Sequence, residues 1–345
     1  MKRINLALQG GGAHGAFTWG VLDVLLQDPE IEIAGITGKS AGALNGAAVK
    51  SGMIRAGRAG ALENLKSLWQ RMGAMREDHL SAFLQPWLQE LGPGNVARAL
   101  EYSLPYAMGE TLSRMMSPYA YGPVYQNPLR PVVEAFDYDS VCSSEGPRLF
   151  VCATNVRTGK ARIFTREEIS TDAILASACL PTMFQAVEID DPETGQTEAY
   201  WDGGYTGNPA LYPLFDKDLP DDVVIVNINP IERSEKPVSP QQIQSRINEI
   251  SFNSALLSEL RAISFVERLI ARGVIAEGDM KAVKVHMIAD DALMNELSSA
   301  TKTVPTGYIL KELFAAGQGA AKAFLATHKA DLGQRSTVDL QATYQ

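Results

Sequence analysis

The sequence has few cysteines and histidines and no long apolar run. Its three cysteines among 345 residues, Cys142, Cys152 and Cys179, have no spacing typical of a disulfide framework or a metal site. We therefore expect free thiols, no bound metal and a reducing, cytoplasmic compartment. A run of about 18 apolar residues, which a transmembrane helix needs, does not occur. Contact with a membrane is therefore expected to be peripheral at most.

Positive charge is also scarce. The 31 lysines and arginines are outnumbered by 40 acidic residues, which gives a net charge of -9, and no dense basic run offsets this locally. This balance argues against a nucleic-acid surface. The basic start, Met1-Lys2-Arg3, resembles a charged leader, but the apolar segment 4–8 is too short for a signal sequence and is expected to be the first strand.

Short β-type segments alternate with helical ones along the chain, and 46% of the residues are hydrophobic. The alternation predicts an α/β fold around a mostly parallel, doubly wound sheet. Long helices are expected at 241–272 and 307–328. A Pro-rich linker at 230–240 precedes a further strand, so we expect the C-terminal part to return to the same sheet. The expected strands are 3–9, 31–36, 148–153, 161–165, 185–189, 223–229 and 283–288.

The pattern changes between residues 72 and 127, where methionine and tyrosine gather around Pro and Gly breaks. We expect an inserted helical cap there. Adaptable methionine and aromatic side chains are suited to lining a groove for an acyl chain, and they are equally typical of ordinary helix packing. The composition of this segment leaves both interpretations open.

A G-x-S-x-G motif, Gly38-Lys39-Ser40-Ala41-Gly42, lies between the apolar run 31–36 and a small-residue helix at 43–49. A strand, a sharp turn and a helix in this order are typical of a nucleophile elbow. Gly38 and Gly42 are expected there because β-carbons beside the nucleophile would block the turn and the packing of the helix. The motif predicts Ser40 as an exposed nucleophile.

A second glycine motif, Gly10-Gly11-Gly12-Ala13-His14-Gly15, directly follows the first expected strand. Ligands of such sheets bind at the carboxyl ends of the strands, so this loop should face Ser40. Unhindered N–H groups of Gly11 and Gly12, joined by that of Ala41, could then stabilise an oxyanion. Loss of one such donor typically costs about 3 kcal/mol of transition-state stabilisation.

The same glycines also fit a dinucleotide-binding turn, because Gly10, Gly12 and Gly15 match G-x-G-x-x-G. Such a site needs an acidic residue at the end of the second strand to hold the ribose. Thr37-Gly38 occupies that position. The oxyanion interpretation is therefore favoured, and no organic cofactor is expected.

A serine hydroxyl needs a positioned base. None of the four histidines, His14, His79, His286 and His328, lies in a sequence pattern typical of one. Asp202 is the better candidate, because Trp201-Asp202-Gly203-Gly204 follows a short β-type segment and its two glycines permit close approach. Taken alone, Asp-Gly-Gly is typical of a turn. An ordinary aspartate is a weak base at neutral pH, and burial would raise its basicity.

With a Gly-rich loop, G-x-S-x-G and Asp-Gly-Gly in this order, the chain resembles the patatin-like phospholipases. The resemblance extends to Ser177-Ala178-Cys179-Leu180-Pro181 and covers residues 4–215. It implies a catalytic domain over that range, and we expect 216–345 to be an extension that completes the same α/β domain. It also implies a three-layer α/β/α sandwich.

The resemblance further implies Ser40 as nucleophile, Asp202 as its base in a Ser-Asp dyad and Gly10–Gly12 as the oxyanion loop. The implied activity is hydrolysis of a lipid acyl ester through an acyl-enzyme, without a metal or cofactor. His14 departs from the family, which commonly carries Arg or Lys there. Two alternatives remain open: an α/β-hydrolase esterase with a Ser-His-Asp triad, and a non-catalytic lipid-binding protein on the same fold. The motif glycines are Gly15, Gly38, Gly42, Gly203 and Gly204.

Overall fold

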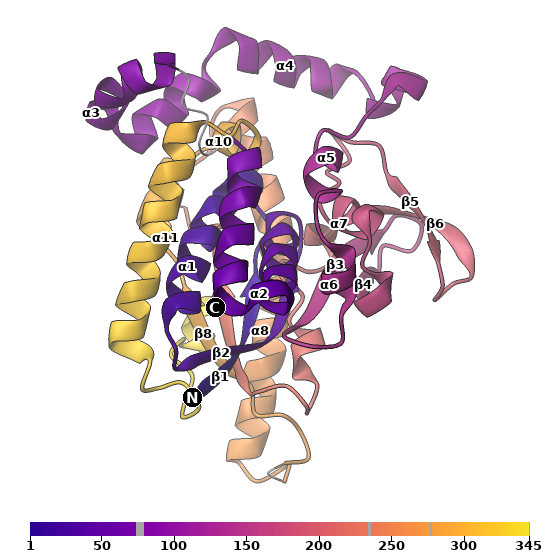
Figure 1. The fold of residues 1–345 in the computed structure, drawn as a ribbon, viewed down its shortest axis with the longest axis vertical. Coiled ribbons are helices and arrows are strands. Elements are labelled where there is room, and N and C mark those ends of the chain that lie inside the picture. The colour runs from indigo at the N-terminus through magenta and orange to yellow at the C-terminus, as the bar shows by residue number, and fades with distance from the viewer. Residues whose placement is uncertain (74–78, 234–235, 277, 345) are drawn as a thin grey trace.

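An eight-stranded sheet runs through the chain (Figure 1). The computed structural model describes residues 1–345 except 74–78, 234–235, 277 and 345. The strand order is β5-β6-β3-β2-β1-β7-β8, with β4 paired to β3. The strands are β1 Lys2–Leu8, β2 Ile31–Gly38, β3 Arg148–Asn155, β4 Ala161–Thr165, β5 Val187–Asp191, β6 Gln196–Asp202, β7 Asp222–Val226 and β8 Lys284–Ile288.

The central strands β3, β2, β1, β7 and β8 are parallel, whereas β4, β5 and β6 pair antiparallel at one side. This confirms the mostly parallel α/β sheet. Leu8 is the register partner of Gly38, and Gly38 is the partner of Val151. The loops that leave β1 and β2 therefore start side by side at the carboxyl edge.

Helices cover both faces of the sheet, which gives three layers (Figure 1). On one side lie α1 Gly15–Gln27, α2 Ala41–Arg71 and α11 Gly307–His328, and on the other lies α8 Pro240–Ala271. The remaining helical elements are η1 Gly12–His14, α3 His79–Glu101, α4 Leu104–Met115, η2 Pro118–Val124, α5 Arg130–Val133, α6 Tyr138–Cys142, η3 Arg166–Glu168, α7 Thr171–Ser177, η4 Gly203–Tyr205, η5 Tyr212–Phe215, α9 Asp291–Glu296, α10 Ser299–Thr303 and α12 Leu340–Tyr344.

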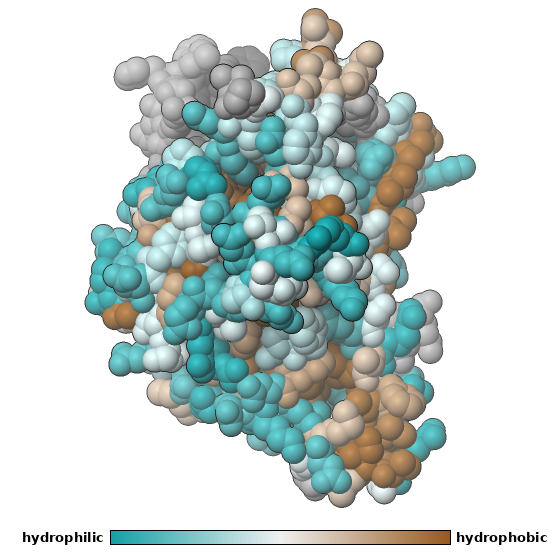
Figure 2. Space-filling view, turned by 90° about the vertical axis from the view of Figure 1, so that its right-hand side faces the viewer, coloured by the Kyte–Doolittle hydropathy of each residue, from teal (hydrophilic) through white to brown (hydrophobic). Residues whose placement is uncertain are grey.

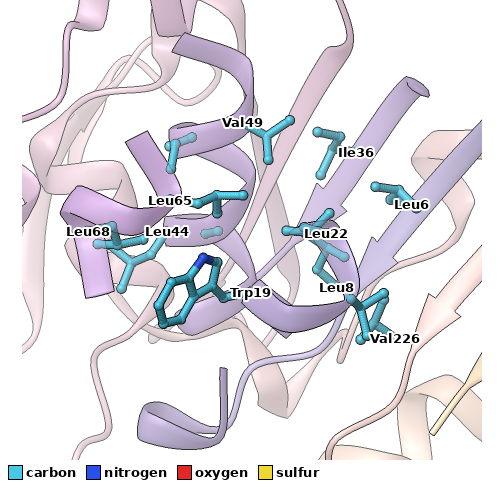
Figure 3. Close-up of a cluster of buried hydrophobic side chains, with 14 of the residues drawn as sticks. Leu6, Leu8, Trp19, Leu22, Ile36, Leu44, Val49, Leu65, Leu68 and Val226 are labelled. Atoms are coloured by element: carbon cyan, nitrogen blue, oxygen red, sulfur yellow. The ribbon is translucent and has the colours of Figure 1, made fainter. Parts of the chain in front are cut away.

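Alternation along the strands divides the core into two clusters. In β1, Leu6 and Leu8 face the cluster under α1 and α2, whereas Ala7 between them faces the cluster under α8. Successive strand residues point to opposite faces of a sheet, so a strand covered on both sides is apolar throughout. Figure 3 shows the first cluster, in which Leu22 of α1 and Leu65 of α2 approach the sheet.

All seven expected strands are present, and both long helices lie within a residue of their expected bounds. The strand expected at 223–229 ends at Val226. Beyond it, the N–H groups of Ile228 and Asn229 donate to the side-chain oxygen of Gln9 instead of a neighbouring strand. In the segment 72–127, which we expect to be an inserted helical cap, the chain forms α3, α4 and η2, and the part at 74–78 lies outside the described residues.

The inserted segment carries many exposed apolar side chains. Leu104, Met108, Leu112 and Met115 follow one another along α4 at helical spacing, and each is more than half exposed. Figure 1 shows α4 running across the top of the molecule. The face shown in Figure 2 is mainly hydrophilic, with apolar patches at its upper and lower ends.

Within the residues that the structure describes, no helix combines the length and apolar content needed to cross a membrane.

Replacing Leu6 with Ala should lower the free energy of unfolding by about 2–5 kcal/mol, because the side chain is fully buried in β1 and leaves a cavity. Urea denaturation measures the change. The matched control is Leu104→Ala in α4, where 72% of the residue is exposed and the expected change is below about 0.5 kcal/mol. Equal losses in the two variants would contradict this assignment of the core.

Candidate active site

Ser40 stands in a strained turn between β2 and α2. Its backbone has φ 51° and ψ -125°, a region that residues other than glycine rarely adopt and that is typical of nucleophile elbows. The Ser40 N–H donates to Ser177 Oγ at 3.2 Å, and the residue is partly exposed. The motif thus forms the strand, turn and helix expected from the sequence.

The glycines of the motif permit close backbone contacts. A β-carbon on Gly42 would lie 2.1 Å from the Leu8 carbonyl oxygen, and one on Gly38 would lie 2.6 Å from the carbonyl carbon of Gly42. In the neighbouring loop, a β-carbon on Gly15 would lie 2.5 Å from that of Ala41. These positions exclude larger residues for steric reasons.

The Gly-rich loop after β1 lies beside the elbow and is anchored by side chains. Asn208 Oδ1 accepts from the Gly10 N–H at 3.0 Å, and Asn229 Nδ2 donates to the Gly10 carbonyl at 2.8 Å. Within the described residues, no hydrogen bond is found for the N–H groups of Gly11, Gly12 or Ala41.

A buried charge network supports the anchor. Lys302 Nζ donates to Asn229 Oδ1 at 3.1 Å and to Glu249 Oε1 at 3.3 Å, and Arg233 also pairs with Glu249. The two cations hold the pKa of Glu249 at about 2 despite its burial. Because these residues lie far from the loop in sequence, no local motif indicated them.

Asp202 ends β6 next to the elbow. Ala153 of β3 is its register partner, its N–H donates to the Cys179 carbonyl at 2.8 Å, and only 1% of the residue is exposed. Its Oδ1 accepts from the Gly204 N–H at 2.7 Å and from Lys39 Nζ at 2.8 Å. Among the described residues, no hydrogen bond joins its carboxylate to Ser40, and none reaches Oδ2.

Lys39 was not identified as a functional residue from the sequence. It is 1% exposed, and its Nζ lies between the Asp202 carboxylate and the ring of Phe252, 4.1 Å from the ring centroid. The sequence signal that could have indicated its role is a lysine between Gly38 and Ser40, because such a turn otherwise favours small residues. Its partner lies 163 residues away and could not be read from the motif.

The two cysteines beside Asp202 are neutral thiols. Burial is the main cause that raises the pKa of both Cys152 and Cys179 to about 12, and the negative charge of Asp202 adds to it. All three cysteines, Cys142 included, are free, as expected. The described part of the chain holds no group of three or more His, Cys, Asp or Glu side chains placed to bind a metal ion.

The histidines with described side chains do not contact Ser40 or Asp202. His14 is buried and bonds Thr301, and burial lowers its pKa well below 6.5, helped by nearby cations. It is therefore neutral and supplies no fixed positive charge. His286 pairs with Asp222 at the first residue of β7, at the opposite edge of the sheet. The side chain of His79 lies outside those described.

His328 is likewise remote from the carboxyl edge. It ends α11 and pairs with Asp331, and the segment just after it accepts hydrogen bonds from Lys2 at the start of β1. The start of β1 is the edge opposite to the elbow.

A cavity of about 740 Å³ opens between α5, α7 and the start of β5. Its wall includes Tyr119, Leu175 and Gln185. The Gln185 carbonyl accepts from Cys179 Sγ at 3.0 Å, and the Cys179 carbonyl accepts from the Asp202 N–H. One residue therefore separates the cavity wall from the end of β6.

Comparison with known proteins identifies the family of the chain. The family model "Patatin-like phospholipase" matches residues 6–215, which is more than half of the chain. Among solved structures, the chain is similar to VipD from Legionella pneumophila, at 14% identity and a TM-score of 0.44, over 95% of this chain and 67% of that one. A search of curated proteins finds no match.

The loop that follows Asp-Gly-Gly should make stability depend on pH. Glu259 of α8 accepts from the Leu211 and Tyr212 N–H groups, and burial raises its pKa from 4.5 to about 7. The folded state thus holds this proton more tightly than the unfolded chain does. Relative to Glu259→Gln, the wild-type free energy of unfolding should fall by up to about 3 kcal/mol between pH 4.5 and pH 7 and then level off.

Chemical denaturation of both proteins across this pH range measures the difference. A difference that stays constant with pH would contradict the raised pKa of Glu259, and one that grows with pH in favour of the wild type would reverse its sign.

Proposed function

Because the chain belongs to the patatin-like phospholipase family, we propose that it is a serine-dependent hydrolase of lipid acyl esters, with Ser40 as nucleophile and Asp202 as general base. The observation that supports this proposal is the strained, partly exposed Ser40 in the turn after β2, together with the buried Asp202 at the end of β6 and the Gly11, Gly12 and Ala41 N–H groups, which have no hydrogen bond among the described residues. These are the parts that acyl transfer to serine requires.

In the first step, Ser40 Oγ attacks the ester carbonyl carbon while its proton passes to Asp202. The carbonyl oxygen becomes an oxyanion, which the N–H groups of Gly11, Gly12 and Ala41 stabilise. The start of α2 adds a favourable helix dipole. The tetrahedral intermediate then collapses to the acyl-serine, and Asp202 returns the proton to the leaving alcohol oxygen.

In the second step, Asp202 takes a proton from water, whose oxygen attacks the acyl-serine carbonyl carbon. The bond between that carbon and Ser40 Oγ then breaks, Asp202 returns the proton to Oγ, and the carboxylic acid leaves. The absence of a direct bond between Ser40 and Asp202 is compatible with this sequence. Catalytic hydrogen bonds in unliganded enzymes are often long and shorten only when substrate is bound.

Exposed apolar side chains support a lipid substrate. We assign the row on α4, from Leu104 to Met115, to contact with the lipid surface that delivers the substrate. Burying such residues against lipid removes apolar area from water at roughly 25 cal/mol per Å². We also propose that the cavity between α5, α7 and β5 binds a portion of the lipid substrate.

We propose that the two parts of the chain have different roles in the same sheet. Residues 4–215 carry the nucleophile, the base and the oxyanion loop. Residues 216–345 complete the same α/β domain with β7, β8 and α8, and through Asn229 and Lys302 they anchor the oxyanion loop.

A fluorophosphonate probe should label the wild type at Ser40, because only an activated serine reacts with it. Ser40→Ala should not be labelled, and its turnover of a lipid ester panel should fall by about 10⁴-fold or more. Mass spectrometry locates the label. A folded wild type that takes up no probe but binds lipid vesicles would instead support the non-catalytic lipid-binding alternative.

Asp202→Asn should lower turnover by about 10³-fold or more, because the amide cannot accept the Ser40 proton. His286→Ala and His328→Ala should keep wild-type turnover as long as circular dichroism shows that they fold. Loss of activity in either folded histidine variant, with Asp202→Asn still active, would favour the Ser-His-Asp triad.

A further inference from the structure

The lysine inside the nucleophile motif is joined to the proposed base. Lys39 Nζ and Asp202 Oδ1 are 2.8 Å apart, and each side chain is 2% exposed. Taking two charges out of water costs several kcal/mol per ion, and this is offset only by close pairing and further hydrogen bonds. We therefore look for a functional reason for this buried pair beside the proposed nucleophile.

The surroundings of Lys39 are shaped to admit its side chain. A β-carbon on Gly10 would lie 2.4 Å from Lys39 Cε, and one on Gly204 would lie 2.6 Å from Nζ. A β-carbon on Gly203 would lie 3.2 Å from Lys39 Cβ. Glycines of the oxyanion loop and of Asp-Gly-Gly thus border the same lysine, and one side chain connects both motifs.

The ammonium also makes the hydrogen bonding of the two Asp202 carboxylate oxygens unequal. Oδ1 of Asp202 is occupied by Lys39 and by the Gly204 N–H, whereas Oδ2 has no hydrogen bond among the described residues. We propose, on the basis of the function proposed above, that Lys39 is a positioning residue that holds Asp202 Oδ1 and so leaves Oδ2 to accept from the Ser40 hydroxyl.

The proton balance is consistent with this role. As Ser40 attacks, its O–H bond breaks and an O–H bond forms on Asp202 Oδ2, while Lys39 keeps its three protons. The neutral carboxyl then faces an ammonium without a counterion. The ammonium favours return of the proton to the leaving alcohol oxygen, which restores the carboxylate.

The other titratable groups around the Lys39–Asp202 pair are either neutral or positively charged. Cys152, Cys179 and Tyr205 face Asp202 and stay protonated at neutral pH, because burial raises the pKa of each to about 12. Lys302 is a further cation near Lys39, and its own partner is Glu249. Lys39 is therefore the cation that is paired directly with Asp202.

The test compares Lys39→Met with Lys50→Met. Lys50 is a second buried lysine, on α2, and it donates to the Glu145 carbonyl away from the site, so it controls for loss of a buried ammonium. We expect Lys39→Met to lower kcat by about 10²-fold with little change in KM. The acid limb of its kcat/KM profile should move up by about one pH unit or more, because the cation no longer favours the carboxylate. Lys50→Met should keep the wild-type limb.

Lys39→Gln provides a second variant if Lys39→Met does not fold, because it keeps a polar head group near Asp202 while removing the positive charge. It should also shift the acid limb. A wild-type limb and wild-type kcat in either folded variant would overturn the proposal. Fluorophosphonate labelling distinguishes failure of the proposed function from failure of the role of Lys39. An unlabelled wild type would refute the hydrolase. A labelled wild type with an unchanged rate–pH profile in Lys39→Met would refute only the role of Lys39.

Discussion

The first turn of α2 packs directly on the end of β1, and the position of Ser40 depends on that contact. The backbone at Gly42 lies so close to the Leu8 carbonyl that no β-carbon would fit. Because β1 and β2 are paired in parallel, the same contact brings the Gly-rich loop beside the elbow. The strain at Ser40 persists because packing on both sides of the turn determines its backbone.

Buried and partly buried ion pairs lie around this contact. Lys39 pairs with Asp202, and Lys302 and Arg233 pair with Glu249, with Lys302 also bonded to the Asn229 side chain that anchors the Gly-rich loop. Buried ion pairs are weak contributors to stability, since desolvation offsets much of the attraction. The pairs of Lys39 and Lys302 adjoin the proposed site, whereas Arg162 pairs with Asp191 between β4 and β5. His286 and Asp222, at the opposite edge, are a buried pair with no such surroundings.

Much of the fold could be predicted from local patterns. The strand around Leu6 is mainly apolar from Ile4 to Leu8, with only Asn5 polar, because helices cover both faces, and such runs are recognisable without a structure. Strand ends were less predictable, because β7 stops where the Gln9 side chain takes over the hydrogen bonds of Ile228 and Asn229. For the site, G-x-S-x-G and the glycine loop indicated their own geometry, since each is one strand, turn and helix.

What the sequence by itself determined is the set of local shapes: a glycine loop after one strand, a serine elbow after the next, and an aspartate before two glycines. Each follows from steric rules that operate over a few neighbouring residues. Only the tertiary structure decided which groups meet. Lys39 finds Asp202 across 163 residues, and Asn229 reaches Gly10 across 219. The reason is that strand order and register bring these ends together, and both are properties of the whole sheet.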